Sequence, residues 1–248
     1  MERTKSITRL LIFSILCSCS GSTVRILEEP KHSTDNYSSK HYAYSFSYNE
    51  DCEQPNWVAY ELLKSELEMN YKRTNRFLED TLVITGTANN LDYKNSGYDK
   101  GHLAPAADMM WSEQAIAESF YFSNITPQLP SFNRGIWKRL EGKIRKWVVK
   151  YDRLYITTGP IFNSYGKTIG ENSVCIPTHF YKIVLIYNDT IKQSIGFIFP
   201  HMKCDSDIFD YAVSIDSVEL VTGEDFYFLI PDKLEEVIEK EYKLKYWN

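Results

Sequence analysis

The sequence predicts an α+β fold in which a central, mainly antiparallel sheet is flanked by helices. Several apolar runs rich in β-branched and aromatic residues follow one another along the chain instead of alternating with helices. The run 179–200 carries Asn188 and Asp189 at its middle, which is turn chemistry typical of a hairpin. Helical periodicity is confined to three segments. These observations exclude a doubly wound parallel sheet.

Four segments are predicted to build the sheet. Each is a short run of β-branched, aromatic and other apolar side chains. They are Trp57–Leu63, Thr81–Thr87, Arg153–Phe162 and His179–Pro200, the last of which forms two strands around its turn.

Three segments are predicted to be helical. The first, Ser112–Phe122, begins with an N-cap type residue and has an acid in its first turn. The second, Asn133–Lys150, has an apolar stripe of helical period, formed by Ile136, Leu140, Ile144 and Trp147. The third, Pro231–Tyr242, repeats this pattern and is expected to pack without any chemical role.

The N-terminus has the features of an export signal. Its basic start is followed by an apolar run from Leu10 to Leu16, which is too short to span a bilayer. The stretch "LCSC" resembles a bacterial lipobox, so Cys19 is expected to be lipidated. We therefore expect a lipoprotein signal peptide at 1–18, a polar tether at 19–40 and one domain at 41–248. The protein would be held at a membrane of the bacterial cell envelope, and ordinary cleavage followed by secretion is the alternative.

The charge distribution is uneven. Loss of residues 1–18 removes three cations and one acid and changes the net charge from -5 to -7, which argues against broad electrostatic binding of nucleic acid. One segment has the opposite character, since 134–150 contains seven cations and a single acid, Glu141. The predicted second helix therefore presents a strongly positive face.

Three cysteines remain in the predicted domain. Cys52, Cys175 and Cys204 allow one disulfide and one free thiol, as expected for an exported protein, and their pairing is open. Their spacing matches no zinc-binding pattern.

Asn133 and Glu141 stand eight residues apart on the basic helix. In a regular α-helix this corresponds to a net rotation of about 80°, so the two side chains lie on neighbouring faces two turns apart. An amide oxygen and a carboxylate are hard donors of the kind that Mg²⁺ accepts directly or through water. Taken alone, the pattern favours an N-cap role for Asn133 and a surface ion pair for Glu141.

His102 lies in the stretch "GYDKGHLAPAADMM", close to Asp99 and Lys100. Taken alone, it is best interpreted as a packed, hydrogen-bonded histidine. A neutral imidazole is also the side chain best suited to deprotonate water, and Lys100 and Arg76 can bind phosphate oxygens. With a cation held by oxygen ligands, this set describes metal-assisted hydrolysis of a phosphodiester. The sequence contains no G-x-S-x-G block, so the motif of a serine hydrolase is missing.

Three blocks occur in an order and spacing that resembles a known family. The blocks "YDKGHLAPAADM", "SNITPQ" and "FNRGIWKRLE" are similar to those of the DNA/RNA non-specific endonucleases, the ββα-metal or His-Me finger nucleases. The resemblance extends from about Tyr44 to Glu239, through "NRFLED", "TGP", "IPTHFYKIVL" and "VELVTGEDFYFLIPD". It implies a ββα-metal nuclease fold and sequence-independent cleavage of DNA and RNA.

The resemblance also implies roles for individual residues. His102 would be the general base, Asn133 a direct ligand of one Mg²⁺, and Glu141 a holder of that ion's water shell. Arg76 would contact the scissile phosphate, with nearby Arg73 as the alternative. Asn124 would order the site by hydrogen bonding, and substrate contacts or ordering would involve Arg134 and Arg139. Mn²⁺ or a similar divalent ion is the alternative cofactor.

Lys100 departs from the family pattern, which commonly has arginine at this position. The change replaces a bidentate fork by a flexible point charge, and we expect activity to survive it. A catalytically inactive nucleic-acid-binding envelope lipoprotein on the same fold is the competing hypothesis. The intact set of His102, Asn133 and Glu141 favours the enzyme. The sequence is compatible with a homodimer as well as with a monomer.

Overall fold

The computed structural model describes residues 27–31, 37–163 and 166–248. Within them, a seven-stranded antiparallel sheet has the order β1-β2-β3-β6-β9-β10-β11. Its strands are β1 (Tyr37–Lys40), β2 (Ser45–Asn49), β3 (Gln54–Leu63), β6 (Arg153–Ile161), β9 (His179–Tyr187), β10 (Lys192–Pro200) and β11 (Ala212–Val213). Two short antiparallel pairs stand apart from it: β4 (Asp99–His102) with β5 (Ile125–Gln128), and β7 (Thr168–Ile169) with β8 (Val174–Cys175).

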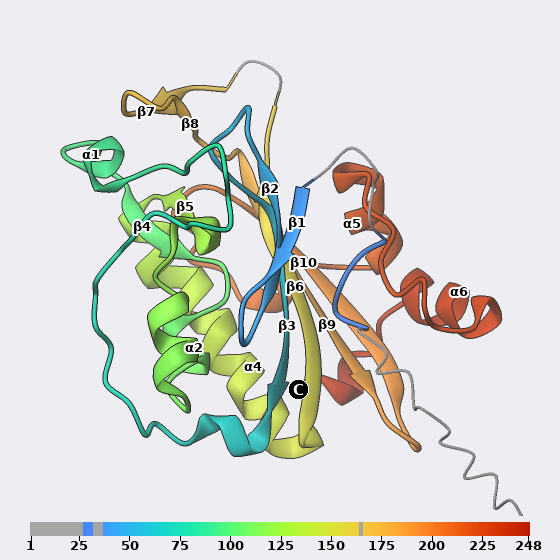
Figure 1. Cartoon of the computed structure of the whole chain (residues 1–248). Helices are drawn as coiled ribbons and strands as arrows, with labels where there is room; N and C mark the ends of the chain where they lie inside the picture. Colours follow the sequence, from blue (N-terminus) through green and yellow to red (C-terminus); the bar gives the residue numbers. More distant parts are fainter. Residues whose placement is uncertain (1–26, 32–36, 164–165) are drawn as a thin grey trace, which may run out of the picture.

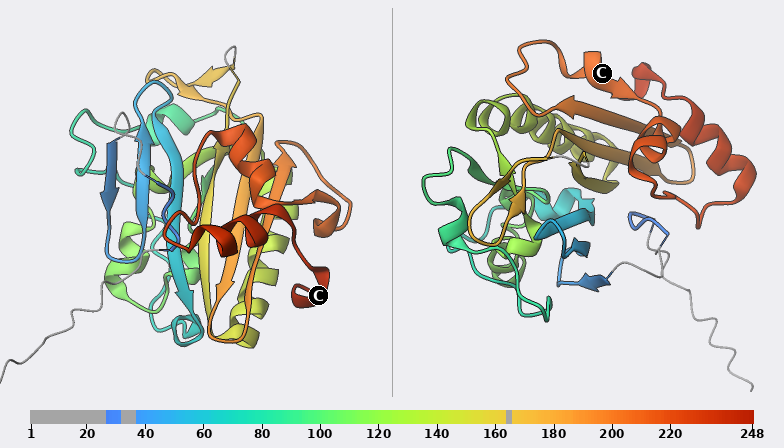
Figure 2. Two further views of the ribbon diagram at one scale, coloured as in Figure 1. Left: turned by 90° about the vertical axis from the view of Figure 1, so that its right-hand side faces the viewer. Right: turned by 90° about the horizontal axis from the view of Figure 1, so that it is seen from above.

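Helices cover both faces of the sheet (Figure 1). On one face lie α2 (Glu113–Glu118) and α4 (Lys138–Tyr151), together with the β4-β5 pair; on the other lie α5 (Ile215–Thr222) and α6 (Asp232–Lys240). Two short helices are α1 (Asn90–Tyr93) and α3 (Pro130–Phe132), and 3₁₀ turns occur at Lys64–Leu67, Ala106–Asp108, Phe122–Asn124, Ile208–Tyr211 and Leu244–Tyr246. Figure 2 shows α5 and α6 lying across the strands. The α+β class with an antiparallel sheet is confirmed.

Strand β9 shows how the sheet serves two cores. Because successive side chains of a strand point to opposite faces, its residues separate by parity. Phe180 and Val184 pack in the core beneath α4, whereas Tyr181 and Ile183 pack in the core beneath α5 and α6. Lys182 has the same parity as Phe180, so its side chain enters the α4 side and is fully buried there.

The strand predicted at Thr81–Thr87 is wrong. These residues form turns because Asp80 caps the segment: its carboxylate accepts from the Leu82 amide at 2.9 Å, and its carbonyl accepts from the Val83 amide at 3.1 Å. Ile84 is left 91% exposed. A local side-chain to backbone hydrogen bond has prevailed over β propensity. The other predicted strands are confirmed, including the hairpin, whose turn is held by the Asn188 side chain accepting from the Ile191 amide.

The predicted helices are confirmed with changed boundaries. The Ser112 hydroxyl accepts from the Ala115 amide at the start of α2, which ends at Glu118. The helix predicted from Asn133 is not regular, because Asn133–Trp137 forms a π-helical segment that is interrupted at Gly135 before α4 begins at Lys138. The ideal-helix rotation between Asn133 and Glu141 therefore does not apply.

The folded part of the chain begins before the predicted boundary at residue 40. Leu27 is buried in the core beneath α5 and α6, and Tyr37–Lys40 pairs with β2. The tether predicted for 19–40 is to this extent wrong, whereas the signal peptide and Cys19 lie outside the described residues. No helix in the described ranges is long and apolar enough to cross a membrane.

A disulfide joins Cys52 to Cys175 and leaves Cys204 as a buried free thiol. It ties the turn between β2 and β3 to β8. Gln54 reinforces the junction, since its amide donates to the Cys175 carbonyl at 2.6 Å and accepts from the Thr126 hydroxyl of β5 at 2.6 Å. The small β4-β5 pair is thus attached to the main sheet through polar contacts.

Candidate active site

A cavity of about 500 Å³ lies between β4 and the start of α4. It unites residues from three separate stretches of the chain, 73–77, 99–107 and 133–145. Its lining consists of Arg73, Phe77, Asp99, Lys100, His102, Pro105, Ala106, Ala107, Asn133, Arg134, Lys138, Glu141 and Arg145. Most of the predicted site residues therefore share one cavity.

The β4-β5 pair places His102 at the edge of this cavity. His102 pairs with Ile125 in the antiparallel register, and its carbonyl accepts from the Trp137 indole at 3.3 Å. Gly101 is required by close approach, because a Cβ at this position would lie 2.2 Å from the buried Gln128 side chain. The glycine before His102 therefore lets the two strands meet and sets the position of the imidazole.

The His102 ring is only 8% exposed and lies among aromatic rings. Its centroid is 4.9 Å from the Phe120 ring, edge on, and 5.6 Å from the Phe77 ring. Burial, with the charge of Arg73 as the lesser cause, lowers the pKa of His102 to about 3. Its Nε2 has no hydrogen-bond partner among the described residues. The ring is therefore neutral at neutral pH, with a nitrogen available to accept a proton.

Asp99 holds the residues that follow β5. Its carboxylate accepts from Arg134 at 2.9 and 2.6 Å and from the Asn133 amide nitrogen at 2.9 Å. Partial burial opposes ionisation, but these hydrogen bonds outweigh it and lower the pKa of Asp99. Because Nδ2 of Asn133 is engaged, its Oδ1 is the amide atom suited to bind a cation.

Glu141 lies beside a group of buried charges behind the cavity. Burial raises the pKa of Glu141, whereas the nearby charges of Lys182 and Arg145 act in the opposite direction. Arg145 contacts the fully buried Asp108 carboxylate at 2.8 Å. Lys182 donates to the Leu103 carbonyl at 3.0 Å, next to His102, and its ammonium lies 4.7 Å from the Trp137 ring. Glu141 and Asn133 thus supply two hard oxygen donors to the cavity, which fits a largely hydrated divalent cation.

Asn124 is fully buried and does not line the cavity. Its Oδ1 accepts from the Ala104 amide at 2.8 Å, and its Nδ2 donates to the carbonyls of Ala104 and Ser119 at 2.9 and 2.8 Å. The side chain therefore uses its hydrogen-bonding capacity to hold the segment directly after His102.

Only some of the residues predicted to contact phosphate line the cavity. Lys100 lines the cavity, where its ammonium donates to Asn90 at 2.6 Å and lies 4.2 Å from the Phe77 ring. Arg76 does not line the cavity, whereas Arg73 does. The position of the two side chains therefore favours the alternative, Arg73, for the phosphate contact. Arg139 also lies outside, with its guanidinium donating to the Cys204 and Ser206 carbonyls.

Sequence reasoning missed Arg145, Asp108 and Lys182 as parts of the site. Arg145 had a usable signal, because it follows Glu141 by four residues and so lies on the same helical face. Lys182 had a weaker one, as a single cation within the apolar run "FYKIVLIY". Asp108 had no usable signal, because nothing in the sequence distinguishes it from the other acidic residues.

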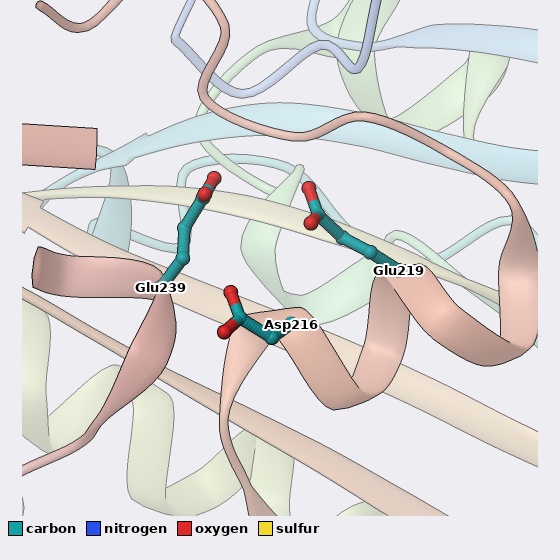
Figure 3. Close-up of side chains that lie close together, drawn as sticks. All are labelled: Asp216, Glu219 and Glu239. Atoms are coloured by element: carbon teal, nitrogen blue, oxygen red, sulfur yellow. The ribbon is translucent and has the colours of Figure 1, made fainter. Parts of the chain in front are cut away.

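A second group of oxygen donors lies on the opposite side of the sheet. Asp216 and Glu219 of α5 and Glu239 of α6 place carboxylate oxygens within 4.8 Å of one another (Figure 3). Burial, followed by the repulsion of neighbouring carboxylates, raises the pKa of Glu239 to about 9. Glu239 therefore carries a proton at neutral pH, and the group is separate from the cavity.

Comparison with known proteins places this arrangement in context. The sequence model of the DNA/RNA non-specific endonuclease family matches residues 23–233. Mitochondrial endonuclease G of Bos taurus is 35% identical over 182 residues, which are 67% of this chain and 61% of that protein. Nuclease C1 of Cunninghamella echinulata var. echinulata is 33% identical over 210 residues, which are 78% and 82% of the two chains.

The fold is also shared with a solved structure. A chain in the crystal structure of the EndoG/EndoGI complex superposes with a TM-score of 0.77 and 28% sequence identity, covering 84% of this chain and 92% of that one. The chain spans between 53% and 61% of the length of the endonuclease G and EXOG relatives that it matches first.

The buried position of His102 leads to a prediction about its titration. The unfolded chain takes up a proton near the ordinary pKa of about 6.5, whereas the native ring does so only near 3. Between these values the unfolded state binds more protons, so this residue lowers the free energy of unfolding as the pH falls from about 6.5 toward 3. In NMR spectra of metal-free protein, the His102 ring signal, assigned by its loss in His102→Ala, is expected to stay constant from about pH 8 to about pH 5. A midpoint near 6.5 would show that the native ring is not shielded.

Proposed function

Because this chain belongs to the DNA/RNA non-specific endonuclease family, we propose that it hydrolyses phosphodiester bonds of DNA and RNA without sequence preference, assisted by one Mg²⁺ or similar divalent ion. The observation that carries the proposal is the shared cavity. It combines a neutral imidazole, the oxygen donors Asn133 and Glu141, and several cations.

In the proposed reaction His102 is the general base. One ring nitrogen accepts a proton from water, the water oxygen forms a bond to phosphorus, and the bond from phosphorus to the leaving sugar oxygen breaks with its electron pair passing to that oxygen. The depressed pKa keeps the ring unprotonated across the neutral range. The aromatic rings of Phe77 and Phe120 fix its orientation.

Asn133 and Glu141 are the residues proposed to hold the divalent ion, Asn133 directly through Oδ1 and Glu141 through the water shell. When bound, such an ion supplies positive charge that stabilises the phosphate and the leaving oxygen. Asp99 orients the Asn133 amide by accepting from its Nδ2. Arg73 and Lys100 are proposed to bind the remaining phosphate oxygens.

Sequence independence follows from the kind of contacts available. The side chains proposed to contact substrate are cations and metal ligands, which bind the sugar-phosphate backbone and read no base edges. Binding is then expected to weaken as salt concentration rises.

We also propose that the protein acts in the cell envelope and is anchored through lipidated Cys19. The Cys52–Cys175 disulfide supports an oxidising compartment. Mass spectrometry of the mature N-terminus is expected to find an acylated Cys19. An unmodified N-terminus elsewhere in the segment would show that the protein is released.

A plasmid-nicking assay tests the enzymatic proposal. Wild-type protein with Mg²⁺ is expected to nick and linearise supercoiled DNA, and EDTA is expected to abolish this. His102→Ala is expected to lower the rate roughly 100- to 10,000-fold, because a general base contributes this much. Circular dichroism of the variant checks that the fold is intact. Full activity in EDTA or in the folded variant would refute the mechanism, and an inactive wild type that still binds DNA would favour the competing binding protein.

The two arginines form a matched pair for testing the phosphate contact. Arg73→Ala is expected to lower kcat/KM for DNA roughly 10- to 100-fold, because a charged hydrogen bond to the transition state is lost. Arg76→Ala removes the same side chain from outside the cavity and is expected to change kcat/KM less than about threefold. Steady-state kinetics on both variants decide the assignment. A larger loss of kcat/KM in Arg76→Ala than in Arg73→Ala would assign the phosphate contact to Arg76.

A further inference from the structure

A groove of about 320 Å³ lies beside the catalytic cavity and is bounded by α4 and residues 207–209. Lys138 lines both the groove and the cavity, so the two are adjacent. The groove is also lined by Arg139, Gly142, Lys143, Lys146, Asp207, Ile208 and Phe209. Four cations therefore face one acid in this depression.

Helical geometry explains why the cations gather here. Measured around the α4 axis from Lys138, Gly142 lies at about 40°, Lys146 at about 80°, Arg139 at about 100° and Lys143 at about 140°. On the other side of Lys138, Arg145 and Glu141 lie at about 20° and about 60°. The buried residues Leu140, Ile144, Trp147 and Val148 occupy the remaining sector. One helix thus presents the catalytic cavity and the groove as adjacent faces.

The lysines of the groove are available to a ligand. Among the described residues, Lys138, Lys143 and Lys146 have no carboxylate partner within 4.0 Å, whereas the acid of the groove, Asp207, caps the Phe209 amide at 2.9 Å. The Lys143 ammonium lies 5.4 Å from the Phe209 ring, which holds it at the groove wall. The positive charge is therefore not neutralised within the protein.

We propose that this groove binds the sugar-phosphate backbone of the nucleic acid that flanks the scissile phosphate. The inference rests on the proposed function and extends it from the cleaved bond to the strand beside it. Lys138 and Lys146 are separated by about 12 Å along the helix, so the groove can lie alongside more than one phosphate of a strand. The binding is independent of base sequence. Substrates long enough to reach the groove are bound more tightly and cleaved with a higher kcat/KM than short ones.

Gly142 lies between Lys138 and Lys146 and offers a sharp test. A Cβ at this position would meet no atom within 4 Å, so a side chain can be introduced without a clash. Gly142→Glu places a carboxylate in the groove, four residues from each lysine, and Gly142→Gln adds the same volume without charge. The difference between these two variants reports on charge alone.

Fluorescence anisotropy with a labelled duplex of about 20 base pairs measures the effect, with His102→Ala as the background to prevent cleavage. Gly142→Glu is expected to bind about tenfold more weakly than Gly142→Gln at about 0.1 M salt. Lys143→Ala/Lys146→Ala is expected to reduce the slope of log K against log salt by roughly 1.8, since each phosphate contact contributes about 0.9. The control Lys233→Ala/Lys240→Ala removes two exposed cations from α6, on the opposite face, and is expected to keep the wild-type slope.

Cleavage kinetics give the second measurement. In variants with His102 intact, the loss of kcat/KM caused by Gly142→Glu is expected to be at least about fivefold greater on the duplex than on a dinucleotide, which cannot reach the groove. Equal affinity of the Glu and Gln variants, or an unchanged salt slope in the double lysine variant, would overturn the proposed groove. A wild-type protein that binds the duplex with the expected slope but cleaves no substrate would refute the proposed function and leave the groove standing.

Discussion

The carboxylate of Asp99 is the contact on which the geometry of the cavity depends. It joins β4 to the segment that precedes α4, through Arg134 and Asn133. Since His102 lies on the same strand as Asp99, this contact fixes the base relative to the residue proposed to bind the ion. The π-helical segment makes the arrangement possible, because it displaces Asn133 from the path of a regular helix and presents it to the cavity.

The site also depends on a group of largely buried charges. Lys182 rises from the central sheet into the space beneath α4 and contacts the backbone next to His102. Asp108, Arg145 and Glu141 surround it with charges of both signs. Removing water from isolated charges is costly, so a group of this kind is stable only when its members compensate one another. Polar contacts thus organise the cavity, although both faces of the sheet also have apolar cores of their own.

Local pattern was sufficient to predict much of this molecule. The strands at β3, β6, β9 and β10 were predictable because their apolar runs are long. The grouping of His102, Lys100, Asn133 and Glu141 was predictable from the order and spacing of the blocks that resemble the family, because helical spacing alone favoured other roles for Asn133 and Glu141. The sequence could not decide whether Arg73 or Arg76 contacts the phosphate. Both lie in an irregular segment, where no periodicity indicates which side chain faces the cavity. The error at Thr81–Thr87 has the same origin, because Asp80 directs the backbone by hydrogen bonds that a propensity scale ignores. The role of Lys182 could not be predicted, because the sequence does not show which face of the sheet lies behind the cavity.

The bond between Cys52 and Cys175 closes a covalent ring, and every protein group proposed to touch substrate lies on that ring, from Arg73 to Lys146. A protease that cut once within it, for example in the exposed stretch 68–76, would open the ring without releasing a fragment. Both halves of the catalytic cavity would remain tethered to the sheet. This connectivity keeps the parts of the proposed active site in one molecule even after the chain has been nicked.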